Sequence, residues 1–472
     1  MTRAAKCRRA AERIGLCMLI PLKLDRGQPL QQQLYDQLYQ LIGSGRLAAG
    51  TRMPSTRMMA EQFSVSRITV LLTYQRLIAE GCLATVPAQG TFVSRLPEQQ
   101  PRIPIAPAAG QGRQPVRTAG RPDCRLFPSG RWRTLIREAL DHLGANLAAE
   151  HADGDPALRG AIANWLSTSR GLAVDPDQII LANSHQHALH TATHFLLRPG
   201  AQVIAESPCD PRTETLIATT GAVLTRVPVD EWGLCTDLLP PGPAAMALVT
   251  PEHQRPLGSV LSEARRHALL AWATESGATV VADDVDGELR YEAMDFPPLM
   301  GMESGNRVVH LGGFSLSLGP GVDIGYLVVP CHMVAAARSA ARVIDCHASR
   351  LESSALAGLL GSGAYARHLH QVRKVYLGRR DTLIRSLRQR FGADTHISGT
   401  AGGLTLVWHF PPRLGDAGQL AELAAHEGLD ASPLGRATIL LGFGLPEERH
   451  IAPAVARLAE VVLSAKPAVS HR

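Results

Sequence analysis

The sequence predicts an α/β protein with two unequal parts: a small N-terminal domain of helices and a β-ribbon, and a large domain built on a mainly parallel β-sheet. Its 472 residues are too many for one ordinary domain. A stretch rich in proline, glycine and glutamine, "LPEQQPRIPIAPAAGQGRQPVRTAGRP", divides the chain and has no periodic apolar face. Beyond it, short apolar runs alternate with helical stretches, which is typical of helices that cover a parallel sheet.

Composition excludes several classes of protein. Apolar residues make up 45% of the chain, yet no apolar run is long enough for a membrane-spanning helix, so we expect no membrane partner. The eight cysteines are scattered without a Cys-x-x-Cys pair. This argues against a zinc ribbon, a redox pair or a secreted disulfide framework, and favours a reducing cytoplasm.

The positive charge lies almost entirely in the first part of the chain. Residues 1–98 contain 13 lysine and arginine residues against 6 aspartate and glutamate residues, a net charge of +7, whereas the whole chain has +6. A basic N-terminal part is expected of a domain that faces a polyanion such as DNA. A solvated basic surface is the alternative that charge alone leaves open.

Residues 1–18 are basic and lack the apolar core of a signal peptide, so we expect a disordered extension, with Met18 as an alternative start.

The pattern of residues 19–95 predicts three helices and two strands. "PLQQQLYDQLYQLIGSG" has leucines at helical spacing, and Pro54 and Ser55 supply the start of a second, short helix. In "SVSRITVLLTYQRLIAEG", Ser64 or Ser66 can cap the third helix. "CLATVPAQGTFVSR" predicts two short strands around a turn at Gln89 and Gly90.

This order of elements is that of a winged helix-turn-helix domain, in which the start of the last helix enters the major groove of DNA. Arginine suits phosphate or a guanine edge, hydroxyl groups suit phosphate oxygens, and a backbone amide at the tip of the wing can approach a phosphate. The residues that we expect to contact DNA are Arg57, Ser66, Arg67, Thr69, Gly90 and Thr91.

The pieces "PLQQQLYDQL", "LAAGTRMPSTRMMAEQFSVSRITV", "LIAEG" and "GTFV" resemble, in order, the DNA-binding domain of the GntR superfamily of bacterial regulators. The wing differs from the family pattern because "VPAQGTFV" has little positive charge before Gly90. The sequence therefore predicts a GntR-type domain at 19–95 with weak phosphate contacts from its wing, followed by a flexible linker at 96–121.

The large domain, 122–472, is predicted from its strands. The candidate strands are "QIILA", "AQVIAES", "MALVT", "ATVVADD", "RVVHLGG" and "IGYLVV". The motifs "GDPALRGAIANWL", "VTPEHQRPLG", "VVADDVDGELRY" and "FSLSLGPGVDIGYLVVP" look like the fold-type I aminotransferase domain of the MocR subgroup of GntR regulators. That resemblance implies a domain that binds pyridoxal phosphate, senses small amines or amino acids, and forms a head-to-tail homodimer.

The resemblance also shows where the cofactor site is changed. The lysine that forms the family's Schiff base falls on Leu316, and a carbon side chain cannot form an imine. The phosphate-binding arginine falls on Asp323, and the tyrosine that bonds the ring hydroxyl falls on Val285. Asp210 stands where a stacking aromatic residue is expected, and Ser184 replaces a glycine of the phosphate turn. These changes predict a degenerate site without a catalytic residue.

Other polar residues of the implied site are retained. Asp283, rather than Asp284, is expected to face a pyridinium nitrogen, and the turn at Ser184 can present amides to an anion. The expected remnant of the cofactor pocket consists of Ser184, His185, Arg255, Asp283, Ser315 and Ser317. It now holds the fold, binds another ligand, or binds pyridoxal phosphate weakly and without a covalent bond.

The function that we predict is a sequence-specific transcription regulator in the bacterial cytoplasm, associated with the nucleoid. Its partners are double-stranded DNA, a second copy of the chain and a possible small-molecule effector. One alternative is an active aminotransferase with a DNA-binding appendage, against which Leu316 argues. The other is a metal-responsive repressor that uses the histidines of "HQHALHTATH", but no carboxylate or cysteine lies close enough in sequence to complete a site, and we expect no metal.

Overall fold

The computed structural model describes residues 20–22, 24–25, 27, 29–94, 119–143, 154–292, 296–302, 306–393 and 395–464. The chain divides into two compact units, one ending at Arg113 and the other beginning at Gln114. The expected extension at 1–18 and residues 96–118 of the expected linker lie outside the described residues.

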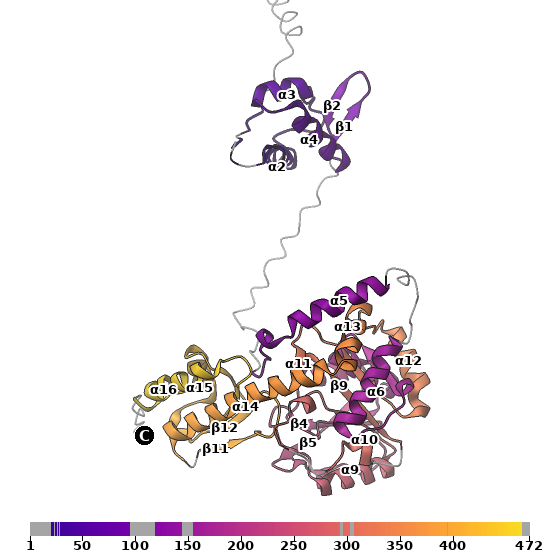
Figure 1. Cartoon of the computed structure of the whole chain (residues 1–472), viewed down its shortest axis with the longest axis vertical. Helices are drawn as coiled ribbons and strands as arrows, with labels where there is room; N and C mark the ends of the chain where they lie inside the picture. Colours follow the sequence, from indigo (N-terminus) through magenta and orange to yellow (C-terminus); the bar gives the residue numbers. More distant parts are fainter. Residues whose placement is uncertain are drawn as a thin grey trace, which may run out of the picture. The chain divides into compact units, whose positions relative to one another are not determined.

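The first unit has the predicted helix-turn-helix and wing (Figure 1). Its elements are α2 (Leu30–Gly43), α3 (Thr56–Phe63), α4 (Arg67–Ala79), β1 (Leu83–Val86) and β2 (Gly90–Val93). The two strands pair antiparallel, with Val86 opposite Gly90, so the turn of the wing consists of residues 87–89. Val70, Tyr74 and Leu77 of α4 are buried, as their spacing predicts, and join the leucines of α2 in one core.

Serine side chains set the starts of the two helices of the helix-turn-helix. The hydroxyl oxygen of Ser55 accepts a hydrogen bond from Met58 N, and that of Ser66 accepts one from Thr69 N at 3.0 Å. Of the two candidate caps of α4, Ser66 is therefore the one used. Ser64 instead ends α3 in a left-handed conformation, with φ of 51°.

The second unit is built on a twisted sheet, and among its described residues eight strands form this sheet in the order β3-β10-β9-β8-β7-β4-β5-β6. Their bounds are β3 (Ile179–Ala182), β4 (Gln202–Ser207), β5 (Val223–Asp230), β6 (Gly233–Leu234), β7 (Met246–Val249), β8 (Thr279–Asp283), β9 (Val308–Gly313) and β10 (Gly325–Val328). The pairs from β9 through β8, β7 and β4 to β5 are parallel, whereas β10 and β6 run antiparallel to their neighbours. The sheet is mainly parallel, as predicted.

Helices cover both faces of this sheet. Alternate side chains of β3 belong to different cores. Ile180 packs with α7 (His185–Leu196), α8 (Pro211–Thr219) and α12 (Val334–Val343), whereas Ile179 packs with α6 (Pro156–Arg170) and α13 (Arg350–Gly361). On the face of the sheet that α6 and α13 cover, α9 (Glu263–Ser276) packs against β7 and β8. The helices of this part are α5 (Ser129–Leu143), α6 (Pro156–Arg170), α7 (His185–Leu196), α8 (Pro211–Thr219), α9 (Glu263–Ser276), α10 (Leu299–Met302), α11 (Ser315–Leu318), α12 (Val334–Val343) and α13 (Arg350–Gly361).

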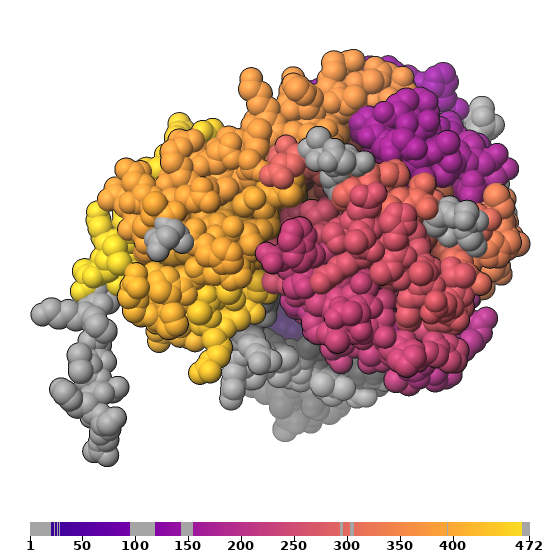
Figure 2. Space-filling model, turned by 90° about the horizontal axis from the view of Figure 1, so that it is seen from below, coloured from indigo at the N-terminus to yellow at the C-terminus, as the bar shows by residue number. Residues whose placement is uncertain are grey.

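The C-terminal part of the second unit forms a smaller lobe, which Figure 2 shows in orange and yellow beside the larger lobe. Its described strands form an antiparallel sheet in the order β11-β12-β14-β13. The elements are α14 (Ala364–Phe391), β11 (His396–Ser398), β12 (Thr405–His409), α15 (Ala417–His426), β13 (Asp430–Pro433), β14 (Thr438–Gly442) and α16 (Glu448–Ser464). The long helix α14 runs from the larger lobe into this one (Figure 1).

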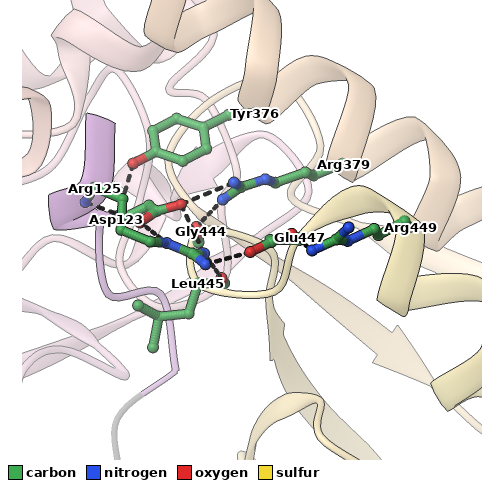
Figure 3. A network of polar contacts seen from close by, with 8 residues as sticks. All are labelled: Asp123, Arg125, Tyr376, Arg379, Gly444, Leu445, Glu447 and Arg449. Atoms are coloured by element: carbon green, nitrogen blue, oxygen red, sulfur yellow. Dashed lines mark hydrogen bonds and ion pairs between the residues drawn. The ribbon is translucent and has the colours of Figure 1, made fainter.

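A polar network fixes the start of the second unit to the smaller lobe (Figure 3). Asp123 is 5% exposed; its backbone amide donates to the hydroxyl group of Tyr376, and its carboxylate pairs with Arg379 at 2.8 Å. Burial alone would raise the pKa of Asp123, but hydrogen bonds from Arg125 and Arg379 outweigh burial and lower it. Just before this point, Gly120 N donates to Asp430 Oδ2, so residues 119–121 of the expected linker belong to the second unit.

Among the described residues, no helix combines the length and the apolar character that crossing a bilayer requires.

Candidate functional site

The start of α4 carries three of the predicted DNA-contacting residues, Ser66, Arg67 and Thr69, and their geometry differs. Ser66 Oγ caps the helix and lies 2.7 Å from Thr69 Oγ1, so these two hydroxyl groups are bonded to each other. Arg67 is exposed, and its Nε lies 3.4 Å from Thr56 Oγ1 at the first residue of α3. Arg67 therefore stands where the starts of α3 and α4 meet, with its guanidinium free to turn toward a polyanion.

Arg57 and the wing lie near the same helices but differ from the expectation in detail. Arg57 pairs with Glu61 at 3.1 Å on the exposed surface of α3, which offsets part of its charge. Gly90, with φ of +120°, begins β2, and a Cβ atom there would lie 3.2 Å from Arg52 Nε. Arg52 was not among the expected contacts, and its guanidinium adds positive charge beside Gly90. The sequence gives no indication that Arg52 lies at the wing, because the β-bridge between Arg52 and Phe92 forms only in the folded unit.

A second group of residues at the start of α4, which was not among the expected contacts, is apolar. Ile68, Leu71 and Leu72 of α4 have exposed fractions of 69%, 44% and 43%. They lie on the face opposite Val70, Tyr74 and Leu77, at spacings of three and four residues. The pattern was visible in the sequence, because these residues are apolar yet fall outside the inward stripe of α4.

In the second unit, the carboxyl ends of the parallel strands meet at one edge of the sheet, which is where open α/β sheets bind ligands. Ser184 follows β3, Thr250 follows β7, Asp283 ends β8 and Ser315 follows β9. Ser184 Oγ caps α7 by accepting from His187 N at 3.1 Å. The backbone of β10 lies close behind this turn, since a Cβ atom on Gly325 would come within 2.5 Å of Ser184 O.

The imidazole of His185 reaches from this turn to the end of β8. His185 Nε2 lies 2.8 Å from Asp283 Oδ1, and the two side chains are 10% and 11% exposed. Asp283 also accepts a hydrogen bond from Val285 N. The resemblance predicts that Asp283 faces a pyridinium nitrogen, and His185 is expected in the anion-binding turn. In the structure these two residues instead form a pair, so the partner of Asp283 is the imidazole nitrogen of His185.

The cavity beside this pair is small. It has a volume of about 30 Å³ and is lined by His185 and Asp283 together with Glu206, Thr250 and Arg255, among others. That is room for a few water molecules. Burial raises the pKa of Glu206 to about 7, and its carboxyl group accepts hydrogen bonds from Thr250 N and Gln254 Nε2 at 3.1 and 3.2 Å.

A larger pocket of about 270 Å³ adjoins the first and shares Arg255 and Asp210 with it. Arg255 Nη1 lies 3.8 Å from Asp286 Oδ1, an atom that is buried without a hydrogen-bond partner. The charge of Asp286, followed by those of Asp283 and Asp210, raises the pKa of Arg255. The apolar part of the lining consists of Ala119, Pro208, Pro211, Pro256, Leu316, Leu404, Pro433, Leu434 and Leu440.

Leu316 lines this larger pocket with its side chain, whereas the serines on either side of it do not both face the site. Ser317 is buried and bonds to Tyr365 and to the carbonyl oxygen of Phe314, at 2.8 and 3.1 Å. The expectation that Ser317 keeps its hydroxyl at the pocket is therefore wrong, because α11 turns it into the core. Ser315, the first residue of α11, is half-buried.

Two further carboxylates stand where cofactor contacts are expected. Asp210 caps α8 by accepting from Arg212 N and pairs with the guanidinium of Arg212 at 2.7 Å. Asp323 Oδ1 is buried without a hydrogen-bond partner, just before β10. Asp284 pairs with Arg170 and lines neither of the two cavities, so Asp283 is the member of this adjacent acidic pair that lines the site.

The histidines of α7 are spread along the helix. His190 and His194 have ring centroids 6.4 Å apart, and the pKa of His190 is lowered by burial first and then by its histidine neighbours. Within the described part of the chain, no three histidine, cysteine, aspartate or glutamate side chains are placed to hold a metal ion together.

Comparisons with known proteins agree with both units. Residues 30–93 match the family of bacterial regulatory proteins described as gntR, and residues 125–433 match aminotransferase class I and II. The chain is 32% identical to the probable rhizopine catabolism regulatory protein MocR of Rhizobium meliloti, and the match covers 89% of each chain.

The chain belongs to the MocR-type regulators of the GntR family. Two further relatives, each 32% identical, are the regulator TauR of Rhodobacter capsulatus and the pyridoxine biosynthesis regulator PdxR of Corynebacterium glutamicum. The matches cover 86% of this chain and 88% of TauR, and 82% of this chain and 85% of PdxR. The protein is thus a helix-turn-helix transcription regulator with an aminotransferase-like domain.

Solved structures support the fold of the second unit. The structure of an archaeal alanine:glyoxylate aminotransferase matches with a TM-score of 0.67 and 25% identity, over 74% of this chain and 90% of that one. A multiple substrate aminotransferase from Thermococcus profundus matches with a TM-score of 0.65 and 23% identity, over the same shares.

The fold implies pyridoxal phosphate, but the residues present do not fit that group as a covalently held cofactor. Leu316 offers no amine, and Asp283 is already paired with His185. The space next to that pair has room for only a few water molecules, and Asp323 brings a carboxylate where the family has an arginine. Lys374 is exposed on α14 and lines neither of the two cavities.

Proposed function

We propose that this MocR-type regulator binds an operator through its winged helix and uses its aminotransferase-like domain as a ligand-binding and dimerising module without transamination. The observation that carries the second part is the side chain of Leu316 in the pocket, at the position of the family's lysine. Without an amine there, no Schiff base to the chain can form.

The larger pocket suits a small organic ligand with an apolar body. Most of its apolar lining is leucine and proline, and its charged groups are Arg255, Asp286 and Asp210. A ligand that offers an acceptor to Arg255 and a hydrogen-bond donor to the unpartnered Asp286 Oδ1 would complete the site. Such a ligand would be held by contacts and hydrogen bonds alone.

A homodimer on DNA is the assembly that we infer. A two-fold dimer presents two equal recognition helices, and it reads two equal half-sites. The DNA contacts expected from each copy are those of Arg57, Ser66, Arg67, Thr69, Gly90 and Thr91. We add Arg52 to this expectation, because its guanidinium lies beside Gly90 of the wing. Light scattering of the full-length protein, free and with operator DNA, tests this assembly.

The deciding experiment is an absorbance titration of the full-length protein with pyridoxal phosphate, followed by borohydride. No aldimine band and no fixed adduct are expected. A band that borohydride fixes to one lysine would overturn the proposal and restore an aminotransferase with a DNA-binding appendage. Arg255→Gln and a pocket-distant control, Arg413→Gln, then separate pocket binding from surface binding: a non-covalent ligand of the pocket loses affinity in the first variant only.

A further inference from the structure

The recognition helix α4 has an exposed apolar face that the expected arginine and hydroxyl contacts to DNA do not use. Successive residues of an α-helix are about 100° apart, so Ile68, Leu71 and Leu72 fall within one arc of about 100°. The buried residues Val70 and Leu77 lie on the other side of the helix. The core of the unit is therefore complete without the three apolar side chains, and they are presented to whatever binds α4.

Their place on the helix identifies that partner. All three lie in the first six residues of α4, which begins at Arg67. Isolated apolar residues on a surface need no explanation, but three on one arc of a helix mark an interaction face. The flanking Arg67 is exposed, and residues 1–98 have a net charge of +7, so the surroundings are complementary to a polyanion and not to another apolar protein surface.

The major groove of DNA offers one apolar group, the C5-methyl of thymine. From these observations we propose that Ile68, Leu71 and Leu72 read thymine methyl groups, so that the regulator takes part of its sequence specificity from apolar contacts. This inference rests on the DNA-binding function of the winged helix. It predicts operator half-sites with thymines at the positions that face these three side chains, with Arg67 anchoring the helix to phosphate or to a neighbouring guanine.

The test removes the methyl groups without changing base pairing. Full-length protein first selects duplexes from a random pool, and single thymines of the selected half-site are then replaced by deoxyuridine. Loss of a buried methyl contact weakens binding by about fourfold per position. We expect such a loss at one to three thymines of each half-site, measured by fluorescence anisotropy at one fixed salt concentration.

Variants connect each methyl group to a side chain. Ile68→Ala, Leu71→Ala and Leu72→Ala should each weaken binding to the thymine duplex and abolish the preference for thymine over uracil at one position. Ile78→Ala is the matched control, because Ile78 is also apolar and 37% exposed but lies in the last turn of α4. It should keep both the affinity and the preference.

Three results would overturn the proposal. Uracil tolerated within twofold at every thymine would show that no methyl group is read. An equal loss on thymine and uracil duplexes in all three variants would show that the face only positions the helix. A changed oligomeric state of the variants in light scattering would show a protein interface. Failure to select any duplex would instead refute DNA binding itself, so the two failures are distinguishable.

Discussion

His185 Nε2 and Asp283 Oδ1 form a buried pair at 2.8 Å, between residues 98 positions apart in the sequence. The resemblance to aminotransferases gives this aspartate the role of holding a pyridinium nitrogen. Here an imidazole nitrogen of the same chain takes that contact, from the turn that would hold the cofactor's phosphate. Together with the hydrogen bond from Val285 N, the pair satisfies the carboxylate of Asp283, so the site can be stable without a cofactor.

This pair leads to a prediction about restoring the lysine. Leu316→Lys alone is expected not to give transamination of any amino acid, because His185 still occupies Asp283 and Asp323 still opposes a phosphate group. The measurement is single-turnover absorbance with pyridoxal phosphate and a panel of amino acids. Turnover by the single variant would refute this account of the site.

A double variant separates the two obstacles. Leu316→Lys combined with His185→Ser frees Asp283 and opens space beside it, and it should bind pyridoxal phosphate at least tenfold more tightly than Leu316→Lys, on the order of 1.4 kcal/mol. His194→Ser in the Leu316→Lys background is the matched control, because His194 lies in the last turn of α7 and lines neither of the two cavities near Asp283. Equal affinities of the two double variants would show that His185 does not block the site.

Arg67 should contribute to operator affinity through its charge. Arg67→Ala is expected to weaken binding by at least about 1 kcal/mol and, if the contact is to phosphate, to lower the salt slope by about one ion. Arg413→Ala is a control of equal charge, on an exposed residue of the second unit, and should leave both unchanged. A salt-controlled titration in which Arg67→Ala matches the wild type would contradict the placement of this residue at the DNA.

The larger features of the fold could be predicted because they depend on local patterns. The six strands expected in the large domain are all present, since each is a short apolar run buried on both faces. β5 was missed because polar residues interrupt its sequence "VLTRVPVD" and much of it is exposed near the edge of the sheet. The sheet of the smaller lobe was not predicted because two of its strands, β11 ("HIS") and β13 ("DASP"), are mostly polar and give no apolar run.

The site was predictable as a set of residues and not as an arrangement. Sequence places His185 and Asp283 in separate motifs, and nothing in either motif indicates that a side chain will cross from one to the other. Ser317 shows the same limit, because its neighbour Leu316 faces the pocket while Ser317 turns to Tyr365. The exposure of Ile68 follows from helical spacing, but only when it is known which face of α4 is buried.

Glu206 gives the second unit a distinct dependence of stability on pH. Its pKa is raised from 4.5 to about 7, chiefly by burial. A group whose pKa is higher in the folded state stabilises the fold below its unfolded pKa and loses this contribution as pH rises through the folded value. The contribution of Glu206 to the free energy of unfolding should therefore fall by about 3 kcal/mol between pH 4.5 and pH 7.

Glu206→Gln removes this titration and should flatten the pH dependence by that amount. All five tryptophans lie in the second unit, so tryptophan fluorescence during urea unfolding reports on that unit alone. Glu275→Gln, on the exposed surface of α9, is the control and should retain the wild-type slope. An unchanged slope in Glu206→Gln would show that this carboxyl group titrates normally in the folded protein.

The network around Asp123 predicts a large loss of stability from one substitution. Asp123→Ala leaves the guanidinium of Arg379, which is 6% exposed, without its carboxylate. An orphaned buried charge costs about 3–5 kcal/mol, and urea unfolding followed by tryptophan fluorescence measures it.

Arg449→Ala is the control. It breaks an ion pair of the same network whose arginine is 75% exposed, and it should change stability by less than about 0.5 kcal/mol. The double variant Asp123→Ala with Arg379→Met removes the orphaned charge as well, so it should recover part of the loss. If Asp123→Ala costs no more than Arg449→Ala, the network does not anchor the start of the second unit to the smaller lobe.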